Sequence, residues 1–139
     1  MSFIGKFHPL LVHFPIALVL AAAVAELVVI ATPRQTWRTV AVANIRAGAA
    51  MGVVAAITGW LFAASPLVDA STSLEWHRWV GMAGAAGAIG AALLSMRLDV
   101  TSRRSAFVYR VMLFVTALLV AITGHLGGTL VWGAMFFRW

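Results

Sequence analysis

Long apolar runs alternate with short polar links along the whole chain. The runs cover about residues 9–30, 40–64, 79–96 and 107–131. Each is close to the roughly 20 residues that an α-helix needs to cross the hydrocarbon core of a bilayer. The links are too short to form a domain of their own. The pattern therefore predicts one all-α domain over residues 1–139, an integral membrane four-helix bundle.

Composition supports a membrane protein and excludes several kinds of chemistry. Of the 139 residues 63% are hydrophobic and 10% are charged, and the mean hydropathy is +0.98. Soluble domains are about half apolar and about a quarter charged. The chain has no cysteine, so disulfides, covalent c-type haem attachment, iron–sulfur ligation and a thiol nucleophile are excluded. The net charge of +6 comes from basic residues at the ends of the apolar runs, which indicates membrane topology and no nucleic-acid partner.

Basic residues are distributed unevenly between the two sides of the predicted bundle. One side carries Arg34, Arg38, Arg97, Arg103 and Arg104, with Arg110 just inside the fourth run, and the other carries Lys6, Arg78 and Arg138. Most tryptophans fall near the second side: Trp60, Trp76, Trp79, Trp132 and Trp139. Cytoplasmic loops are enriched in Lys and Arg, and tryptophans gather at membrane interfaces. We therefore expect a bacterial inner-membrane protein with both termini outside.

Small residues and a short repeat mark the second, third and fourth runs. Gly48 and Gly52 form a G-x-x-x-G motif, and Gly81, Gly84, Gly87 and Gly90 recur every third residue. Such glycines let helices approach closely in lipid, so we expect them to pack within the bundle. Residues 56–61 (AITGWL) resemble residues 121–126 (AITGHL), and at nearly the same offset His13 matches His77. This match indicates either that the two hairpins are related or that two apolar sequences became similar by chance.

All four histidines are predicted to lie in the outer half of the bilayer. His8 and His77 fall at the boundary, whereas His13 lies about 6 Å inside it and His125 about 9 Å inside it, at 1.5 Å per helical residue. Boundary histidines are often simply interfacial. Ionisable residues within the hydrocarbon usually face the bundle interior and serve a function. His13 and His125 are therefore the first candidates for ligands, with His77 and His8 as the reserve pair.

Histidines on different helices suit a flat cofactor between helices at least as well as a small ion. Neutral imidazole is a common ligand of haem iron, copper and zinc. Gly124, Gly127 and Gly128 flank His125, and glycines let a bulky group approach a backbone. No carboxylate is expected near the histidines, which argues against a hard-metal or di-iron site. Haem b is the cofactor hypothesis, with copper or zinc as the alternative.

Two buried charges remain in the inner half. Glu26 and Arg46 are predicted at similar depths on adjacent helices, so we expect a structural ion pair between them. The chain contains no phosphate-binding loop, dinucleotide fingerprint, catalytic triad or metalloprotease motif. Nothing in the sequence therefore indicates a stand-alone enzyme.

Three segments resemble a known family. Residues 7–17 (FHPLLVHFPIA) match the H-P-x-x-V-H-F-P-I-A signature of a bacterial family of predicted inner-membrane proteins catalogued as a domain of unknown function. Residues 77–81 (HRWVG) and 123–128 (TGHLGG) are similar to the branch of that family that occurs joined to, or encoded beside, c-type cytochromes. The resemblance implies redox work and b-type haem. Trp132 stands where that branch often has a histidine, which departs from the pattern of a second haem site.

Our leading functional hypothesis is a haem-b-binding, cytochrome-like electron-transfer subunit with its cofactor near the outer face. A c-type cytochrome or a larger membrane complex would be its redox partner, and the lipid bilayer its surroundings. One alternative is a non-redox structural or assembly subunit of a membrane complex. The other is a protein that handles copper or zinc at the outer face.

Overall fold

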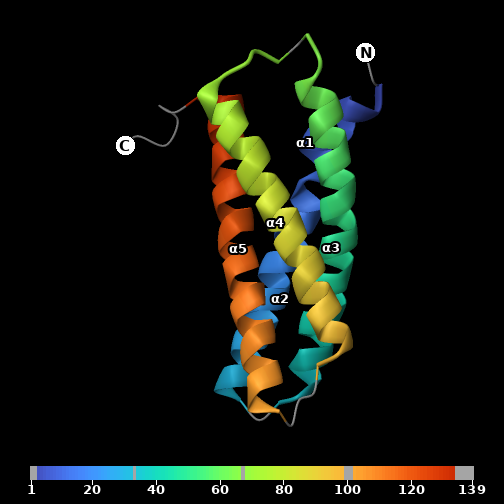
Figure 1. Ribbon diagram of the computed structural model, residues 1–139, viewed down its shortest axis with the longest axis vertical. Coiled ribbons are helices and arrows are strands. Elements are labelled where there is room, and N and C mark those ends of the chain that lie inside the picture. The colour runs from blue at the N-terminus through green and yellow to red at the C-terminus, as the bar shows by residue number, and fades with distance from the viewer. Residues whose placement is uncertain (1–2, 33, 67, 99–101, 134–139) are drawn as a thin grey trace.

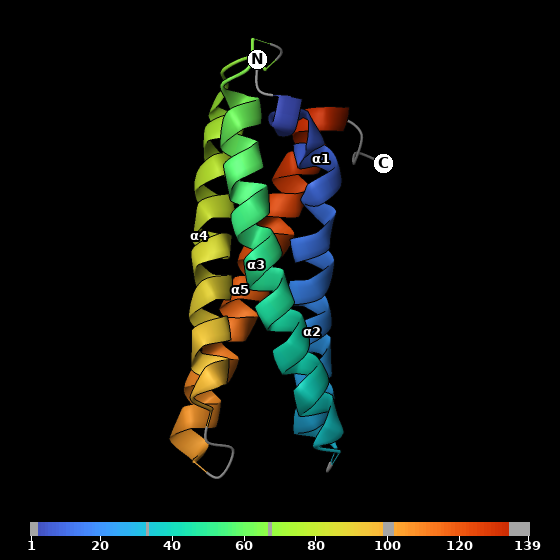
Figure 2. The same ribbon diagram turned by 90° about the vertical axis from the view of Figure 1, so that its right-hand side faces the viewer.

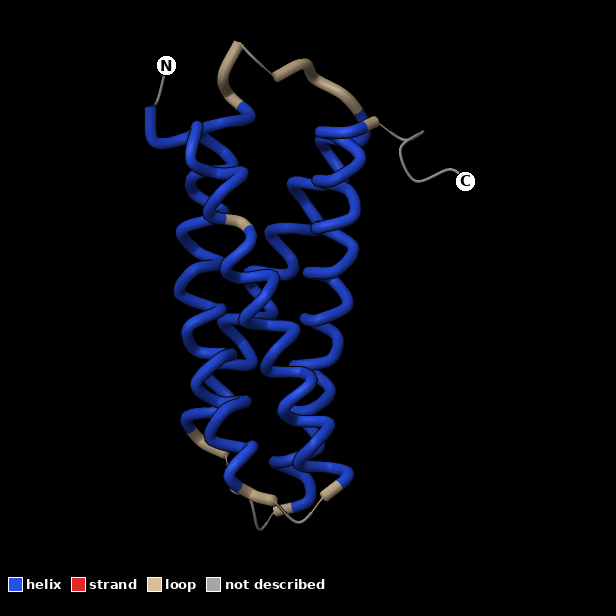
Figure 3. Tube along the Cα trace, turned by 180° about the vertical axis from the view of Figure 1, so that it is seen from behind, coloured by secondary structure: helices blue, strands red, loops and turns tan. Residues whose placement is uncertain are grey.

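The computed structural model describes residues 3–32, 34–66, 68–98 and 102–133, and within these ranges every regular element is helical (Figure 3). The elements are η1 (Phe3–Phe7), α1 (His8–Leu11), α2 (His13–Ala31), α3 (Thr36–Ala63), α4 (Thr72–Met96) and α5 (Arg103–Trp132). The predicted residues Arg138 and Trp139 lie outside the described ranges.

The helices α2, α3, α4 and α5 form an up-down-up-down bundle (Figure 1). Helix α2 packs against α3 and α5, and α4 packs against α3 and α5. We call the end that carries η1, α1 and the α3–α4 connection the terminal end, and the opposite end the basic end. Four helical stretches are long and apolar enough to cross a membrane, the first comprising η1, α1 and α2. The predicted all-α membrane bundle is confirmed.

The first spanning stretch is broken near its start, where the sequence predicts one continuous helix. Helix α1 ends at Leu11, and α2 begins at His13. Pro15 has no N–H to donate to the carbonyl of Leu11, and a proline ring also crowds the carbonyl four residues before it. The break at Val12 follows from that missing bond. It separates the orientation of His8 from that of His13.

Three helices begin before their apolar runs do. Helix α3 starts at Thr36, α4 at Thr72 and α5 at Arg103. Side-chain caps fix two of these starts: the Ser71 hydroxyl accepts from the Leu74 N–H at 3.2 Å, and the Ser102 hydroxyl accepts from the Ser105 N–H at 3.3 Å. Serine at this position satisfies an otherwise unpaired N–H of the first turn. Capping therefore stabilises the polar first turns of α4 and α5, which hydropathy does not detect.

The glycines of α4 lie along its contact with α5. A Cβ added at Gly81, Gly84, Gly87 or Gly90 would have its nearest neighbour in Thr123, Val120, Thr116 or Met112, respectively. The α5 residue numbers fall as the α4 numbers rise, as antiparallel helices require. At Gly87 the added Cβ would lie 2.5 Å from the Thr116 hydroxyl oxygen. The predicted role of these glycines in packing within the bundle is confirmed.

The G-x-x-x-G motif of α3 is used within the same bundle. A Cβ at Gly48 would lie 3.0 Å from Val19 of α2, whereas one at Gly52 would lie 3.9 Å from Ala85 of α4. The two glycines therefore serve two different helix contacts. The surrounding core is built mainly from alanines and a few larger side chains, including Tyr109, Ile45 and Leu113.

Candidate functional site

His8 stands at the start of α1 and reaches sideways to α3. Its Nδ1 lies 3.0 Å from the carbonyl oxygen of Ala55 and 3.4 Å from the hydroxyl of Thr58. The ring rests against Gly59, where an added Cβ would lie 2.9 Å from His8 Cε1. Only a residue without a side chain allows the imidazole this close to the α3 backbone. The side chain is half-buried.

His77 makes the corresponding contacts on the other hairpin. It lies in the second turn of α4, and its Nδ1 lies 3.1 Å from the carbonyl oxygen of Thr123 on α5. The ring rests against Gly127, where an added Cβ would lie 3.0 Å from His77 Cε1. Gly127 therefore makes room for His77, although its position in the sequence suggested a role beside His125.

The two imidazoles meet between the hairpins. Their ring centroids are 6.3 Å apart, and the ring planes are inclined by 75°. Each hairpin thus supplies one histidine, from α1 and from α4, and one supporting helix, α3 or α5. The reserve pair of the sequence analysis is the pair that the structure brings together.

The equivalence of the hairpins differs from the one that the sequence suggested. His8 with Ala55 and Gly59 corresponds to His77 with Thr123 and Gly127. The supporting residues are offset by 68 positions in this alignment, as the numbers 55 and 123 show, whereas the repeated hexapeptide is offset by 65. The difference of three residues is about one helical turn. In these contacts the counterpart of His77 is His8, whereas the sequence repeat matches His77 with His13.

His13 and His125 are exposed on the surface of the bundle. Both belong to the terminal end, as do His8 and His77, because α2 begins at His13 and His125 lies in the last two turns of α5. All four histidines thus share one end of the bundle, and their place in the outer half of the bilayer stays a prediction. Ile16, one turn after His13, lies 3.4 Å from a Cβ added at Gly124, beside His125. The two residues thus lie near the α2–α5 contact, and the pairing of their rings stays a prediction.

Aromatic side chains surround the start of α4 beside His77. The guanidinium carbon of Arg78 lies 3.6 Å from the centroid of the Trp60 ring. Trp60 in turn meets Trp79 edge to face, with centroids 6.3 Å apart. Cation–π contacts of this kind are stabilising, more so when water is excluded. These contacts connect α3 to α4 near the histidine pair.

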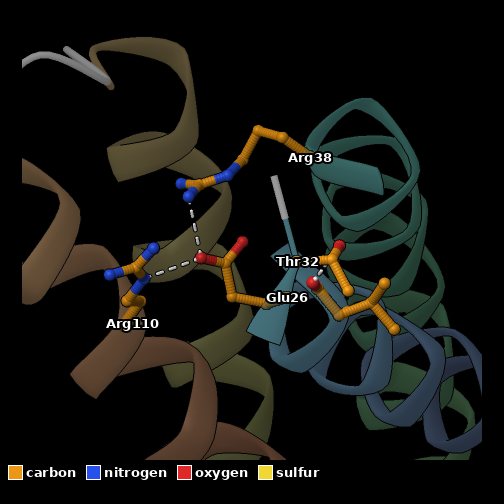
Figure 4. Close-up of polar contacts among 5 residues, drawn as sticks. Glu26, Thr32, Arg38 and Arg110 are labelled. Carbon is orange, nitrogen blue, oxygen red and sulfur yellow. Dashed lines mark hydrogen bonds and ion pairs between the residues drawn. The ribbon is translucent and has the colours of Figure 1, made fainter. Parts of the chain in front are cut away.

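The ion pair of the inner half differs from the predicted one. Glu26 of α2 is 0% exposed, and its Oε1 accepts from Arg38 Nη2 at 2.9 Å and from Arg110 Nε at 2.8 Å (Figure 4). The predicted partner, Arg46, is wrong. Arg38 and Arg46 are eight residues apart on α3, about 80° around the helix, and only Arg38 faces Glu26.

Arg46 instead connects α3 to the last turn of α4. Its Nε donates to the Ser95 hydroxyl at 3.0 Å, and its Nη2 donates to the Ser95 carbonyl at 3.1 Å. Carbonyls in the last turn of a helix have no partner within the helix, and a cation there also suits the helix dipole. Arg46 therefore acts as a C-terminal cap supplied by a neighbouring helix.

The geometry of the histidine pair fixes which nitrogens are available. A carbonyl oxygen only accepts hydrogen bonds, so each Nδ1 must carry the proton that it donates. The lone pair of each neutral ring then lies on Nε2, the arrangement that proteins use to orient metal-binding histidines. Among the described residues, no third His, Cys, Asp or Glu joins the pair in a metal-binding group.

Together the fold and this site describe a four-helix integral membrane protein with a pair of oriented imidazoles at its terminal end. Residues 6–135 match the family described as "Predicted membrane protein (DUF2231)", and the chain belongs to that family. No curated protein and no solved structure matches the chain.

Proposed function

We propose that this protein binds haem b through His8 and His77 and serves as an electron-transfer subunit of a membrane redox system. The observation that carries the proposal is the adjacent pair of imidazoles, each with its Nδ1 on a backbone carbonyl. This assignment replaces the first ligand candidates of the sequence analysis, His13 and His125, with the reserve pair.

The spacing of the rings fits two ligands of one metal ion. Metal–imidazole bonds are about 2 Å long, and each nitrogen lies about 1 Å from its ring centroid, so two imidazoles that bind one metal ion have centroids up to about 6 Å apart. The observed separation is 6.3 Å. Gly59 and Gly127 support the fit, because the absence of a side chain at these positions lets both rings lie against the helices while each Nδ1 is hydrogen-bonded to a backbone carbonyl.

The number of protein donors favours haem over a free ion. Structural zinc takes four protein ligands and catalytic zinc three. A porphyrin supplies four nitrogens of its own, so His8 and His77 would supply the two protein ligands that haem iron still requires. When bound, haem supplies a one-electron change of oxidation state. In the proposed site the protein orients His8 and His77, and Lys6 and Arg78 are the described basic residues of the terminal end that are available to haem carboxylates.

The proposed orientation puts this site at the outer face of the bacterial inner membrane. The arginines gather at the basic end, and cytoplasmic loops are enriched in such residues. The redox partner would then be a protein of the outer side, such as a c-type cytochrome, or a neighbouring subunit of a larger complex.

The test is the absorption spectrum of the protein purified from cells supplied with haem precursor. We expect a Soret band and sharp α and β bands on reduction, as low-spin bis-imidazole haem gives. The His8→Ala and His77→Ala variants should each lose or convert these bands. The His13→Ala and His125→Ala variants are the matched controls, since these histidines lie at the same end but are exposed, and they should keep the spectrum.

Three other outcomes contradict the proposal in distinguishable ways. Loss of the bands in the His13 and His125 variants alone would restore the first assignment of the sequence analysis. Stoichiometric copper or zinc without haem would make the pair part of a metal-handling site. A protein with neither haem nor metal would favour a structural or assembly subunit.

A further inference from the structure

The basic end of the bundle carries an open pocket of about 630 Å³ between the starts of α3 and α5. The lining residues that matter here are Gln35, Arg38, Arg103, Arg104, Phe107 and Arg110, and we call this the arginine pocket. The basic ends of the α2–α3 and α4–α5 hairpins lie apart in Figure 2. Gln35 and Arg38 belong to the α2–α3 hairpin and the other lining residues to the α4–α5 hairpin, so the walls of the arginine pocket come from both hairpins.

The charge of the arginine pocket is far from balanced. Its four arginines carry four positive charges, and Glu26, the one carboxylate among the described residues that forms an ion pair with any of them, leaves +3 among these five side chains. Glu26 uses Oε1 for both of its ion pairs. The Nε and Nη1 atoms of Arg38 are buried without a hydrogen-bond partner among the described residues. The floor of the pocket thus retains uncompensated positive charge.

Two helix dipoles add to this field. Helix α3 begins at Thr36 and α5 at Arg103, next to or within the lining of the pocket. The start of a long helix carries the equivalent of about half a positive charge. Exposed Arg103 and Arg104 stand in the first turn of α5, and Arg110 lines the pocket while its Nε binds Glu26. Arginine is suited to binding phosphate oxygens in pairs.

An apolar wall runs from the pocket along the outside of the bundle. Phe107 lines the pocket and is 66% exposed, and Val111, one turn further along α5, is 46% exposed. These side chains lie within a membrane-spanning helix. A small ion from solution would gain nothing from such a wall, whereas the acyl chain of a lipid would pack along it.

We propose that the arginine pocket binds the phosphate of an anionic phospholipid headgroup, with the acyl chains against Phe107 and Val111. Basic pockets between membrane helices are known to hold such headgroups. The bound phosphate neutralises the excess charge of the two hairpins and joins them at the end where they lie apart. This site is independent of the proposed haem site, which lies at the terminal end.

The test measures the melting temperature of the full chain in a non-ionic detergent. Phosphatidylglycerol, phosphatidylcholine or inorganic phosphate is added in increasing amounts. Phosphatidylglycerol should raise the melting temperature, and the other two should not at equal concentration. The Arg103→Gln and Arg104→Gln variants should each shift the midpoint of the titration by roughly fivefold, since a basic residue near an anionic lipid surface contributes about 1 kcal/mol. Glu75→Gln removes one exposed charge at the terminal end and should leave the midpoint unchanged.

A second measurement on the unaltered chain does not depend on the folding of any variant. Raising the salt from about 0.1 M to about 1 M shortens the Debye length from about 10 Å to about 3 Å. The phosphatidylglycerol midpoint should therefore rise severalfold. Equal stabilisation by phosphatidylcholine, or a midpoint that ignores both salt and the two arginine variants, overturns the proposal. Stabilisation by inorganic phosphate that competes with the lipid would show a site for a free anion instead.

Discussion

The Oε1 atom of Glu26 on α2 accepts a hydrogen bond from the Nε of Arg110 on α5 at 2.8 Å, across 84 positions of sequence. The same oxygen also accepts from Arg38 on α3. One buried carboxylate thus connects three helices and both hairpins. Breaking a buried pair by removing one partner costs about 3–5 kcal/mol, because the remaining charge is left uncompensated.

The Glu26→Gln variant should therefore unfold with a free energy lower by about 3 kcal/mol or more. In a double-mutant cycle, Glu26→Gln and Arg110→Gln should couple by about 1–3 kcal/mol, because the second change removes the charge that the first leaves unpaired. The matched cycle of Glu26→Gln with Arg46→Gln should couple less, since Arg46 binds Ser95. Denaturation in detergent measures all of these terms. Stronger coupling in the second cycle would contradict the observed pairing.

The α4–α5 contact should tolerate a methyl group at one glycine and not at another. A Cβ at Gly87 would lie 2.5 Å from the Thr116 hydroxyl, while the nearest atom to a Cβ at Gly90 is a Met112 side-chain atom at 3.6 Å. Overpacking a tight contact costs about 1–3 kcal/mol. Gly87→Ala should lower the melting temperature, and Gly90→Ala should leave it unchanged or raise it. The opposite order would contradict the packing described for these two turns.

The glycines beside the histidine pair should control cofactor binding. An alanine at Gly59 or Gly127 would place its Cβ 2.9 Å or 3.0 Å from the adjacent imidazole. The ring must then move from the carbonyl that orients it. Loss of such orienting contacts lowers metal affinity about 10–100-fold. We expect Gly59→Ala and Gly127→Ala to lower haem occupancy, measured by the Soret absorbance per protein.

Gly124→Ala is the control for that experiment, because its added Cβ has its nearest neighbour in Ile16 at 3.4 Å. Its haem occupancy should equal that of the unaltered chain. If Gly124→Ala loses haem while Gly127→Ala keeps it, the cofactor lies beside His125 and not beside His77.

The proposed orientation can be tested with single cysteines, since the chain has none of its own. Ser73 is exposed at the terminal end, and Gln35 is exposed at the basic end. A membrane-impermeant maleimide applied to cells with a permeabilised outer membrane should label the Ser73→Cys variant and not the Gln35→Cys variant. Both should be labelled after detergent lysis. The reverse pattern would place the histidines at the cytoplasmic face.

The apolar runs determine much of this protein by themselves. A run of about 20 apolar residues has few stable arrangements other than a membrane helix, because every backbone polar group must be paired within it. The four membrane-spanning stretches and the grouping of all four histidines at one end follow from the order of these runs. The glycine spacing of α4 predicts close packing for the same reason, since it recurs nearly with the helical period.

The partners of each polar side chain were decided only by the tertiary structure. Depth along a helix follows from counting residues, but the direction that a side chain faces depends on where the helix starts, where it breaks and how it rotates. Arg38 joins Glu26 because α3 begins at Thr36, before its apolar run. His8 turns toward α3 because the chain breaks at Val12, and His77 meets it because Gly59 and Gly127 leave room for both rings. A rotation of 100° per residue turns a small error in helix start or break into a different face of the bundle.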